Sequence, residues 1–271
     1  MQDRVCESIN TLARFCGQRD IERLDRAALI EAFGIGRVDV MVLFGGSILA
    51  GGDLLARAIR DGLARTAVIV GGEGHTTQSL RQQVHGEYPQ IETADLPEAE
   101  VFQRYLRHVH GCEADFLETA STNCGNNITN LLALLRARSV PCESILLCQD
   151  ATMQRRMDAG MRKYAPRGLR IVNYAAYAAT VSRVGGELAF EEGIHGMWDM
   201  QRYIRLLMGE IPRLTDDAGG YGPNGKGYIA HVDVPGDAAR AFETLKAVYG
   251  DRVREANPLY ASAASPAPEN G

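Results

Sequence analysis

Residues 37–47, RVDVMVLFGGS, join an apolar and β-branched run directly to a pair of glycines. The run Val38–Phe44 is almost continuously apolar, which is typical of a parallel strand buried on both faces. The same combination returns at residues 67–75, AVIVGGEGH, where Ala67–Val70 precedes a second glycine-rich loop. Three further runs predict strands, at Asp115–Leu117, Ser144–Cys148 and Leu169–Val172.

The segments between these runs carry apolar residues at helical spacing, for example Leu55, Ala58, Ile59 and Leu63. Strands that alternate with helices in this way form a parallel sheet with helices on both faces. Right-handed crossovers bring the carboxyl ends of the strands to one edge of the sheet, where such proteins bind ligands. We therefore expect an α/β fold with a mostly parallel five-stranded sheet and a helical C-terminal appendage.

The sequence outside the sheet predicts further parts of the molecule. Residues 228–234 are expected to form a last strand, and the glycine-rich residues 216–227 either a lid or a plain connector. We divide the chain into an N-terminal helical segment at 1–36, a ligand-binding core at 37–175, a C-terminal helical or lid region packed on the core at 176–256, and a disordered tail at 257–271.

Composition excludes several classes of function. The net charge of -5 and the lack of a basic stripe argue against a nucleic-acid partner. Apolar runs such as Val40–Phe44 are far shorter than the roughly 20 residues of a membrane helix. The six cysteines form no CxxC pair, and the first ten residues have no apolar segment of the signal-peptide kind. We expect a cytoplasmic protein with reduced thiols, no bound metal and no membrane partner; the oligomeric state stays open.

Four polar or glycine-rich motifs follow predicted strands or begin predicted helices. Glycines allow the backbone to approach a ligand closely and to donate N–H groups to it, although they also serve simple tight turns. The polar cluster before the helix at about residue 124 could simply cap that helix. A cap needs only one such residue, however, so the remaining polar side chains would suit a ligand carboxylate. The candidate ligand-binding residues in these motifs are Gly45, Gly46, Ser47, Gly71, Gly72, Gly74, Ser121, Thr122, Asn123, Asn126, Asn127 and Thr152.

Charged and aromatic residues supply the remaining candidates. Arg155 follows the fourth predicted strand and could reach a ligand carboxylate, or it could be solvated. Glu98 begins a helix after Pro97, where its charge also favours the helix dipole. Tyr221 offers a stacking face within the glycine-rich loop. Glu73, His75 and Asp150 are the candidate catalytic groups: Glu73 and His75 lie in the second glycine loop, and Asp150 lies in the motif after the fourth predicted strand.

Four stretches carry a resemblance to a known family: STNCGNN at 121–127, QDATMQRR at 149–156, RYIRLLMGEIPRL at 202–214 and DDAGGYGPNGKGYIAHVDVP at 216–235. With the glycine loops, they resemble the YdcF branch of the YdcF–SanA–ElyC family from about Val38 to Pro235. The resemblance implies a Rossmann-like three-layer sandwich that binds S-adenosylmethionine. The positions thought to contact the ligand in that family match Gly45, Gly46, Gly71, Gly72, Glu98, Ser121, Thr122, Asn123, Asn127 and Asp150.

The chain departs from the family pattern at two positions. Asn126 stands where relatives usually have Glu, and Glu73 stands where the YdcF branch has an apolar residue. An acid is thus lost from one loop and another is placed in the neighbouring loop. This exchange warns against transferring a relative's activity to this chain, because fold alone does not give function.

We expect an enzyme that acts on S-adenosylmethionine, either a lyase or cyclase that releases methylthioadenosine or a transferase. Attack by the α-carbon would need a general base such as His75 or Glu73, whereas the other reactions need mainly positioning and exclusion of water. One alternative is a non-catalytic sensor or carrier of the same ligand. Another is a hydrolase or transferase that uses the glycine loops to bind a phosphorylated metabolite.

Overall fold

The computed structural model describes residues 2–250. Its core is a five-stranded parallel sheet in the order β3-β2-β1-β4-β5. The strands are β1 (Val38–Phe44), β2 (Ala64–Val70), β3 (Phe116–Glu118), β4 (Ser144–Cys148) and β5 (Arg170–Asn173). Every neighbouring pair is parallel, and the register places Val42 of β1 between Val68 of β2 and Leu147 of β4. The predicted α/β sandwich with a Rossmann-like sheet is confirmed.

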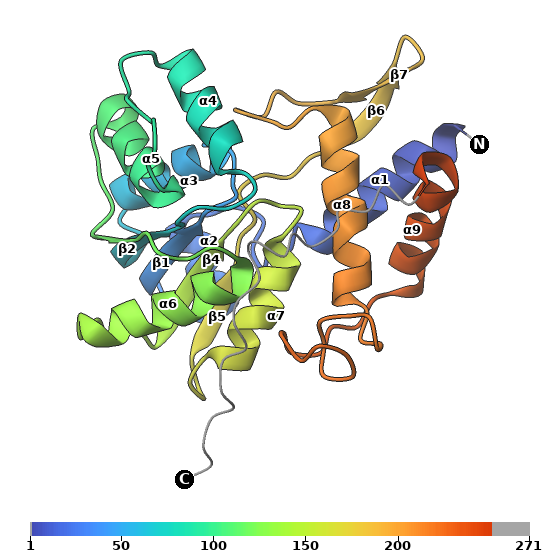
Figure 1. Ribbon diagram of the computed structural model, residues 1–271. Coiled ribbons are helices and arrows are strands. Elements are labelled where there is room, and N and C mark those ends of the chain that lie inside the picture. The colour runs from blue at the N-terminus through green and yellow to red at the C-terminus, as the bar shows by residue number, and fades with distance from the viewer. Residues whose placement is uncertain (1, 251–271) are drawn as a thin grey trace.

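Helices cover both faces of the sheet, as Figure 1 shows. They are α2 (Arg26–Phe33), α3 (Leu49–Arg60), α4 (Thr77–Glu87), α5 (Glu98–Tyr105), α6 (Cys124–Ala137) and α7 (Gln154–Tyr164), with a π-helical turn, η1 (Leu106–His110), after α5. Alternate side chains of β1 pack on opposite faces of the sheet. Val40 and Val42 pack with Ile128 of α6 and Met157 of α7, whereas Met41 and Leu43 belong to the core that contains α3 and α5.

The N-terminal helix and the C-terminal helices form one group beside the sheet. Helix α1 (Gln2–Cys16) contacts both α8 (Met200–Leu214) and α9 (Gly236–Tyr249), and Figure 1 shows the three side by side. The helical appendage expected from the sequence is therefore completed by the first helix of the chain. The expected disorder at 257–271, and the last residues of the region at 176–256, lie outside the described residues.

Two local predictions differ from the structure. The strand expected at Tyr228–Val234 is wrong: this segment is irregular and lies against α7, where the Ala230 N–H donates to the Ala159 carbonyl at 2.9 Å. An antiparallel hairpin of β6 (Val181–Val184) and β7 (Glu187–Phe190) was not expected. Residues 216–227 are irregular, as predicted. Among residues 2–250, no helix combines the length and the apolar character that crossing a membrane requires.

Candidate functional site

The strand order places a topological switch point between β1 and β4. The chain leaves β1 toward β2 on one side and later returns to β4 on the other, so the loops after these two strands diverge. At this point Gln149 Nε2 donates to the Gly45 carbonyl at 2.8 Å. We use "carboxyl edge" for this end of the sheet, which collects the loops that follow β1 to β5.

Three glycines at the carboxyl edge lie where a side chain would not fit. A Cβ on Gly45 would lie 2.2 Å from Glu98 Oε2, and one on Gly72 would lie 2.3 Å from the Ser121 carbonyl oxygen. A Cβ on Gly71 would lie 3.0 Å from the Cα of Gly45. Close packing of the protein against itself therefore accounts for these three glycines.

Gly46 and Gly74 lie in the same loops, but the space beside them is less crowded. Gly46 has a φ of 80°, which favours glycine, and the Met153 methyl lies 3.1 Å from where its Cβ would be. Within the described part of the chain, the nearest atom to a Cβ on Gly74 would be the Thr122 carbonyl oxygen at 3.7 Å. The backbone at Gly74 thus has open space beside it, in contrast to Gly72.

Glu98 is buried at the first turn of α5 and joins the loops after β1 and β2. Its Oε1 accepts hydrogen bonds from Thr76 Oγ1 at 2.9 Å and from Thr77 Oγ1 at 3.0 Å. Its own N–H donates to the Gly72 carbonyl at 2.9 Å. Burial raises the pKa of this carboxyl against the opposing effect of the two threonine hydroxyls. Glu98 therefore lies at the expected place and is held there by internal hydrogen bonds.

The polar cluster at the start of α6 lies beside the second glycine loop. The Gly72 N–H donates to the Ser121 carbonyl at 3.0 Å, which fixes the two loops together. Asn123 caps α6, since its Oδ1 accepts from the Asn126 N–H at 3.0 Å. Asn126 Oδ1 in turn accepts from Asn123 Nδ2 at 2.8 Å, while Asn127 is buried below. Helix capping thus explains one of these polar residues, and the others surround it.

Asp150 is completely buried after β4 and has a full set of partners. Its Oδ1 accepts from the Thr152 hydroxyl at 2.6 Å and from the Tyr177 hydroxyl at 3.0 Å, and its Oδ2 accepts from Trp198 Nε1 at 2.8 Å. Burial raises the pKa of this carboxyl against these hydrogen bonds. Asp150 and Thr152 therefore connect β4 to the segment before α8.

Glu73, His75 and Thr122 are exposed at the rim of the carboxyl edge. Glu73 is 64% exposed and its Oε1 lies 3.3 Å from Arg81 Nη1. Ser47 is the opposite case, because it is buried and its Oγ has no hydrogen-bond partner among residues 2–250. This oxygen lies 2.5 Å from the position that a Cβ on Gly51 would take, so it faces the first turn of α3.

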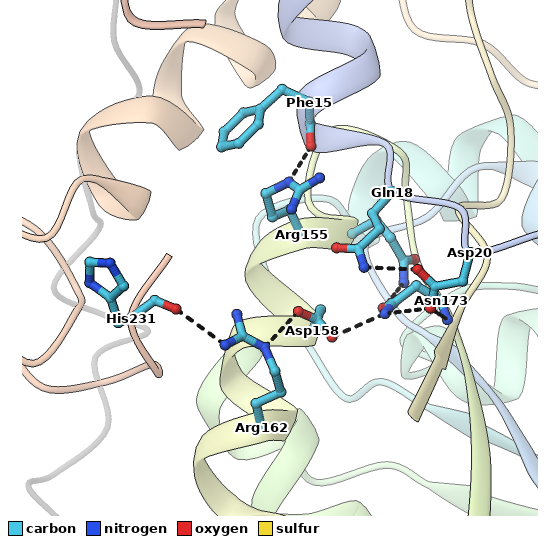
Figure 2. Close-up of polar contacts among 9 residues, drawn as sticks. Phe15, Gln18, Asp20, Arg155, Asp158, Arg162, Asn173 and His231 are labelled. Atoms are coloured by element: carbon cyan, nitrogen blue, oxygen red, sulfur yellow. Dashed lines mark hydrogen bonds and ion pairs between the residues drawn. The ribbon is translucent and has the colours of Figure 1, made fainter. Parts of the chain in front are cut away.

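Arg155 and Tyr221 lie apart from the glycine loops. Arg155 donates from Nε to the Phe15 carbonyl and lies over the Phe15 ring, with 4.5 Å between the guanidinium carbon and the ring centre; Figure 2 shows it between Phe15 and Gln18. The Tyr221 ring lies 5.3 Å from the Tyr228 ring. The structure therefore brings together the expected residues after β1 to β4 and leaves these two elsewhere.

Sequence reasoning missed several residues that build this edge. Gln149 and Gln154 are fully buried, and Gln154 Oε1 accepts from the Gln149 N–H at 2.9 Å. Tyr177 and Trp198 hold Asp150 from distant segments. The position of Gln149 directly after a strand was an available signal, whereas nothing local pointed to Tyr177. In the described part of the chain, no group of His, Cys, Asp or Glu side chains is arranged to hold a metal ion.

A scan of the chain against protein-family models found no match.

Proposed function

We propose that the protein binds S-adenosylmethionine at the carboxyl edge and acts on it, as a lyase or cyclase that releases methylthioadenosine or as a transferase. One observation carries the proposal: glycine loops, a polar helix start and an exposed acid lie together at the carboxyl edge of a sheet that has a Rossmann-type switch point. Ligands of open α/β sheets bind outside the carboxyl ends of the strands at such a point. The resemblance to the YdcF branch supports the choice of ligand.

The rim residues suit the separate parts of this ligand. Its sulfonium is a cation, and the exposed carboxylate of Glu73 is the acid at the rim that would face it. The open backbone at Gly74 allows close approach of the adenosine. The start of α6, next to Thr122 and Asn123, would hold the amino-acid carboxylate through the positive end of the helix dipole.

Cyclisation needs little help from a base. When the substrate carboxylate attacks its own γ-carbon, the new C–O bond replaces the C–S bond, and the sulfur leaves as neutral methylthioadenosine. The carboxylate and sulfonium charges cancel, so no proton is transferred. Positioning and exclusion of water are then the main contributions of the protein. His75 would act as a base only in an attack by the α-carbon.

A non-catalytic binder is the second candidate, and the buried acids favour it. The carboxyl groups of Asp150 and Glu98 are occupied by internal hydrogen bonds, which leaves only rim groups for catalysis. A sensor or carrier needs no catalytic group at all. We also propose a cytoplasmic location, which suits the six free thiols.

A thermal-shift titration followed by mass spectrometry of the same sample tests the proposal. Ligand at 100 times its dissociation constant adds about 2.7 kcal/mol to the stability of the folded state. A shift together with methylthioadenosine supports a lyase or cyclase, whereas a shift with intact ligand supports the binder. No shift contradicts both and directs the search to phosphorylated metabolites. Glu73→Gln should weaken the shift, and Glu243→Gln, an exposed change on α9, should not.

A further inference from the structure

A cavity of about 590 Å³ lies beside the edge strand β5, between α7, the end of α1 and the segment that follows the glycine-rich loop. It is distinct from the glycine loops of the carboxyl edge. Figure 2 shows Arg155, Gln18 and Asp20 gathered near the end of α1, with Arg162 and His231 on another side. The lining residues are Gln18, Asp20, Arg155, Asp158, Arg162, Leu169, Ile171, Asn173, His231, Val232 and Asp233.

Several charges of this cavity are already paired within the protein. Arg162 Nε donates to Asp158 Oδ2 at 2.8 Å, and Asp158 Oδ1 accepts from Asn173 Nδ2 at 3.0 Å. His231 Nδ1 lies 2.6 Å from Asp216 Oδ2. These groups shape the wall of the cavity and have little capacity left for a ligand.

Arg155 differs from Arg162, because it has no ion pair among residues 2–250. Only its Nε is used, in the hydrogen bond to the Phe15 carbonyl, and the stack over the Phe15 ring fixes the plane of the guanidinium. Neither Nη atom has a hydrogen-bond partner in that part of the chain. Partial burial lowers the pKa of Arg155, against the opposing effect of the nearby Asp158. A carboxylate is the group that matches the two open Nη donors.

Gln18 provides a hydrogen-bond acceptor in the same cavity. Its Nε2 donates to Asp20 Oδ1 at 3.0 Å, which fixes the amide, while its buried Oε1 has no partner among the described residues. Asp20 accepts from the Asn173 N–H at 2.7 Å and forms no ion pair with a cation in the described residues. An acceptor and a negative charge therefore lie next to the free guanidinium, which suits an ammonium group.

The remaining wall is apolar. Leu169, just before β5, and Ile171, within β5, are partly buried, and Val232 is buried. A ligand with a charge of each sign at one end and an aliphatic side chain at the other would match Arg155, Gln18, Asp20 and this apolar wall.

We propose that this cavity binds a small aliphatic α-amino acid as its zwitterion. The carboxylate binds the Nη atoms of Arg155, the ammonium binds Gln18 Oε1 and Asp20, and the side chain packs on Leu169 and Ile171. The proposal does not depend on S-adenosylmethionine binding at the carboxyl edge.

Isothermal titration of the whole chain with L-leucine tests this inference. 4-Methylpentanoate lacks the ammonium, 3-methylbutylamine lacks the carboxylate and glycine lacks the side chain, so each should bind at least 10-fold more weakly than L-leucine. No heat with L-leucine at millimolar concentration, or equal binding of all four probes, would overturn the proposal.

Variants separate a loss of binding from a loss of fold. Arg155→Gln should weaken L-leucine binding by about 10- to 100-fold, the equivalent of 1.5–3 kcal/mol for hydrogen bonds to a charged group. Gln18→Leu should also weaken it, and Arg136→Gln, an exposed change on α6, should leave it unchanged. Arg155→Lys keeps the charge and serves if Arg155→Gln does not fold. Wild-type affinity in both Arg155→Lys and Gln18→Leu would contradict the assigned contacts.

Discussion

Trp198 Nε1 donates a 2.8 Å hydrogen bond to Asp150 Oδ2, which joins the segment before α8 to the carboxyl end of β4. The two residues are 48 positions apart, and both are buried. Tyr177 approaches the other oxygen of the same carboxylate from the segment after β5. One buried acid therefore organises three segments, and each donor to it contributes to stability.

Removal of the Tyr177 hydroxyl should destabilise the protein. Tyr177→Phe keeps the ring and removes one donor to a buried carboxylate, so the free energy of unfolding should fall by about 1–2 kcal/mol. Urea unfolding followed by the fluorescence of Trp198, the one tryptophan of the chain, measures this change at the site itself. Tyr228→Phe, at a 55% exposed ring, is the matched control and should change little. Equal midpoints for the two variants would show that the hydroxyl contributes nothing.

Two glycine-to-alanine changes should have opposite effects on the stability of the protein. In Gly72→Ala the new Cβ would lie 2.3 Å from the Ser121 carbonyl oxygen, so backbone must move, at a cost of about 2–3 kcal/mol. In Gly86→Ala, within α4, the Cβ meets nothing within 4 Å among residues 2–250, and the better helix propensity of alanine should add about 0.5 kcal/mol. Thermal unfolding compares both variants with the wild type. Stabilisation by Gly72→Ala would contradict the close approach of these two loops.

The parallel sheet was predictable because each strand is a short apolar run that ends in glycine or a polar residue. The hairpin of β6 and β7 was missed although its turn, Gly185-Gly186, has φ values of 61° and 91° and Gly-Gly is a known hairpin signal. The strand expected at Tyr228–Val234 failed for another reason. Its pattern was β-like, but its backbone hydrogen bond at Ala230 goes to α7, and no local pattern reports such a partner.

The candidate site was predictable only in part. The glycine loops and the capping Asn123 follow from local backbone needs, so their positions could be inferred from sequence. The partners of Asp150 depend on tertiary packing, since Tyr177 and Trp198 lie 27 and 48 residues away. The partner of Arg155 also depends on tertiary packing, because the orientation of α7 places this side chain against Phe15.

The contribution of His195 to stability should depend on pH. Burial opposes its charged form, but hydrogen bonds to Asp53 at 2.7 Å and Glu87 at 2.8 Å outweigh this and raise its pKa. A raised pKa stabilises the folded state fully below the ordinary value of about 6.5, and the effect is lost as the pH rises through the raised value. The Asp53 carboxyl, whose pKa is lowered despite burial, remains charged over this window.

His195→Asn should therefore lower the melting temperature more at pH 6 than at pH 9. High salt should reduce the difference, because the His195 side chain is 31% exposed. His108→Asn is the control, since His108 is bonded to the neutral amide of Gln90 at 2.6 Å. The same loss of melting temperature at both pH values would mean that packing of the ring, and not its charge, stabilises this region.

Removing one partner of the buried ion pair between α7 and α8 should strongly lower the free energy of unfolding. Arg156 Nε and Nη2 donate to the Glu210 oxygens at 2.5 and 2.9 Å, and the side chains are only 11% and 5% exposed. Glu210→Gln leaves the guanidinium buried without a counter-charge, so the free energy of unfolding should fall by about 3 kcal/mol or more. The double change Arg156→Met with Glu210→Leu removes both charges and should recover much of that loss. If Glu210→Gln unfolds in urea at the same midpoint as Glu243→Gln, the pair does not stabilise the contact between these helices.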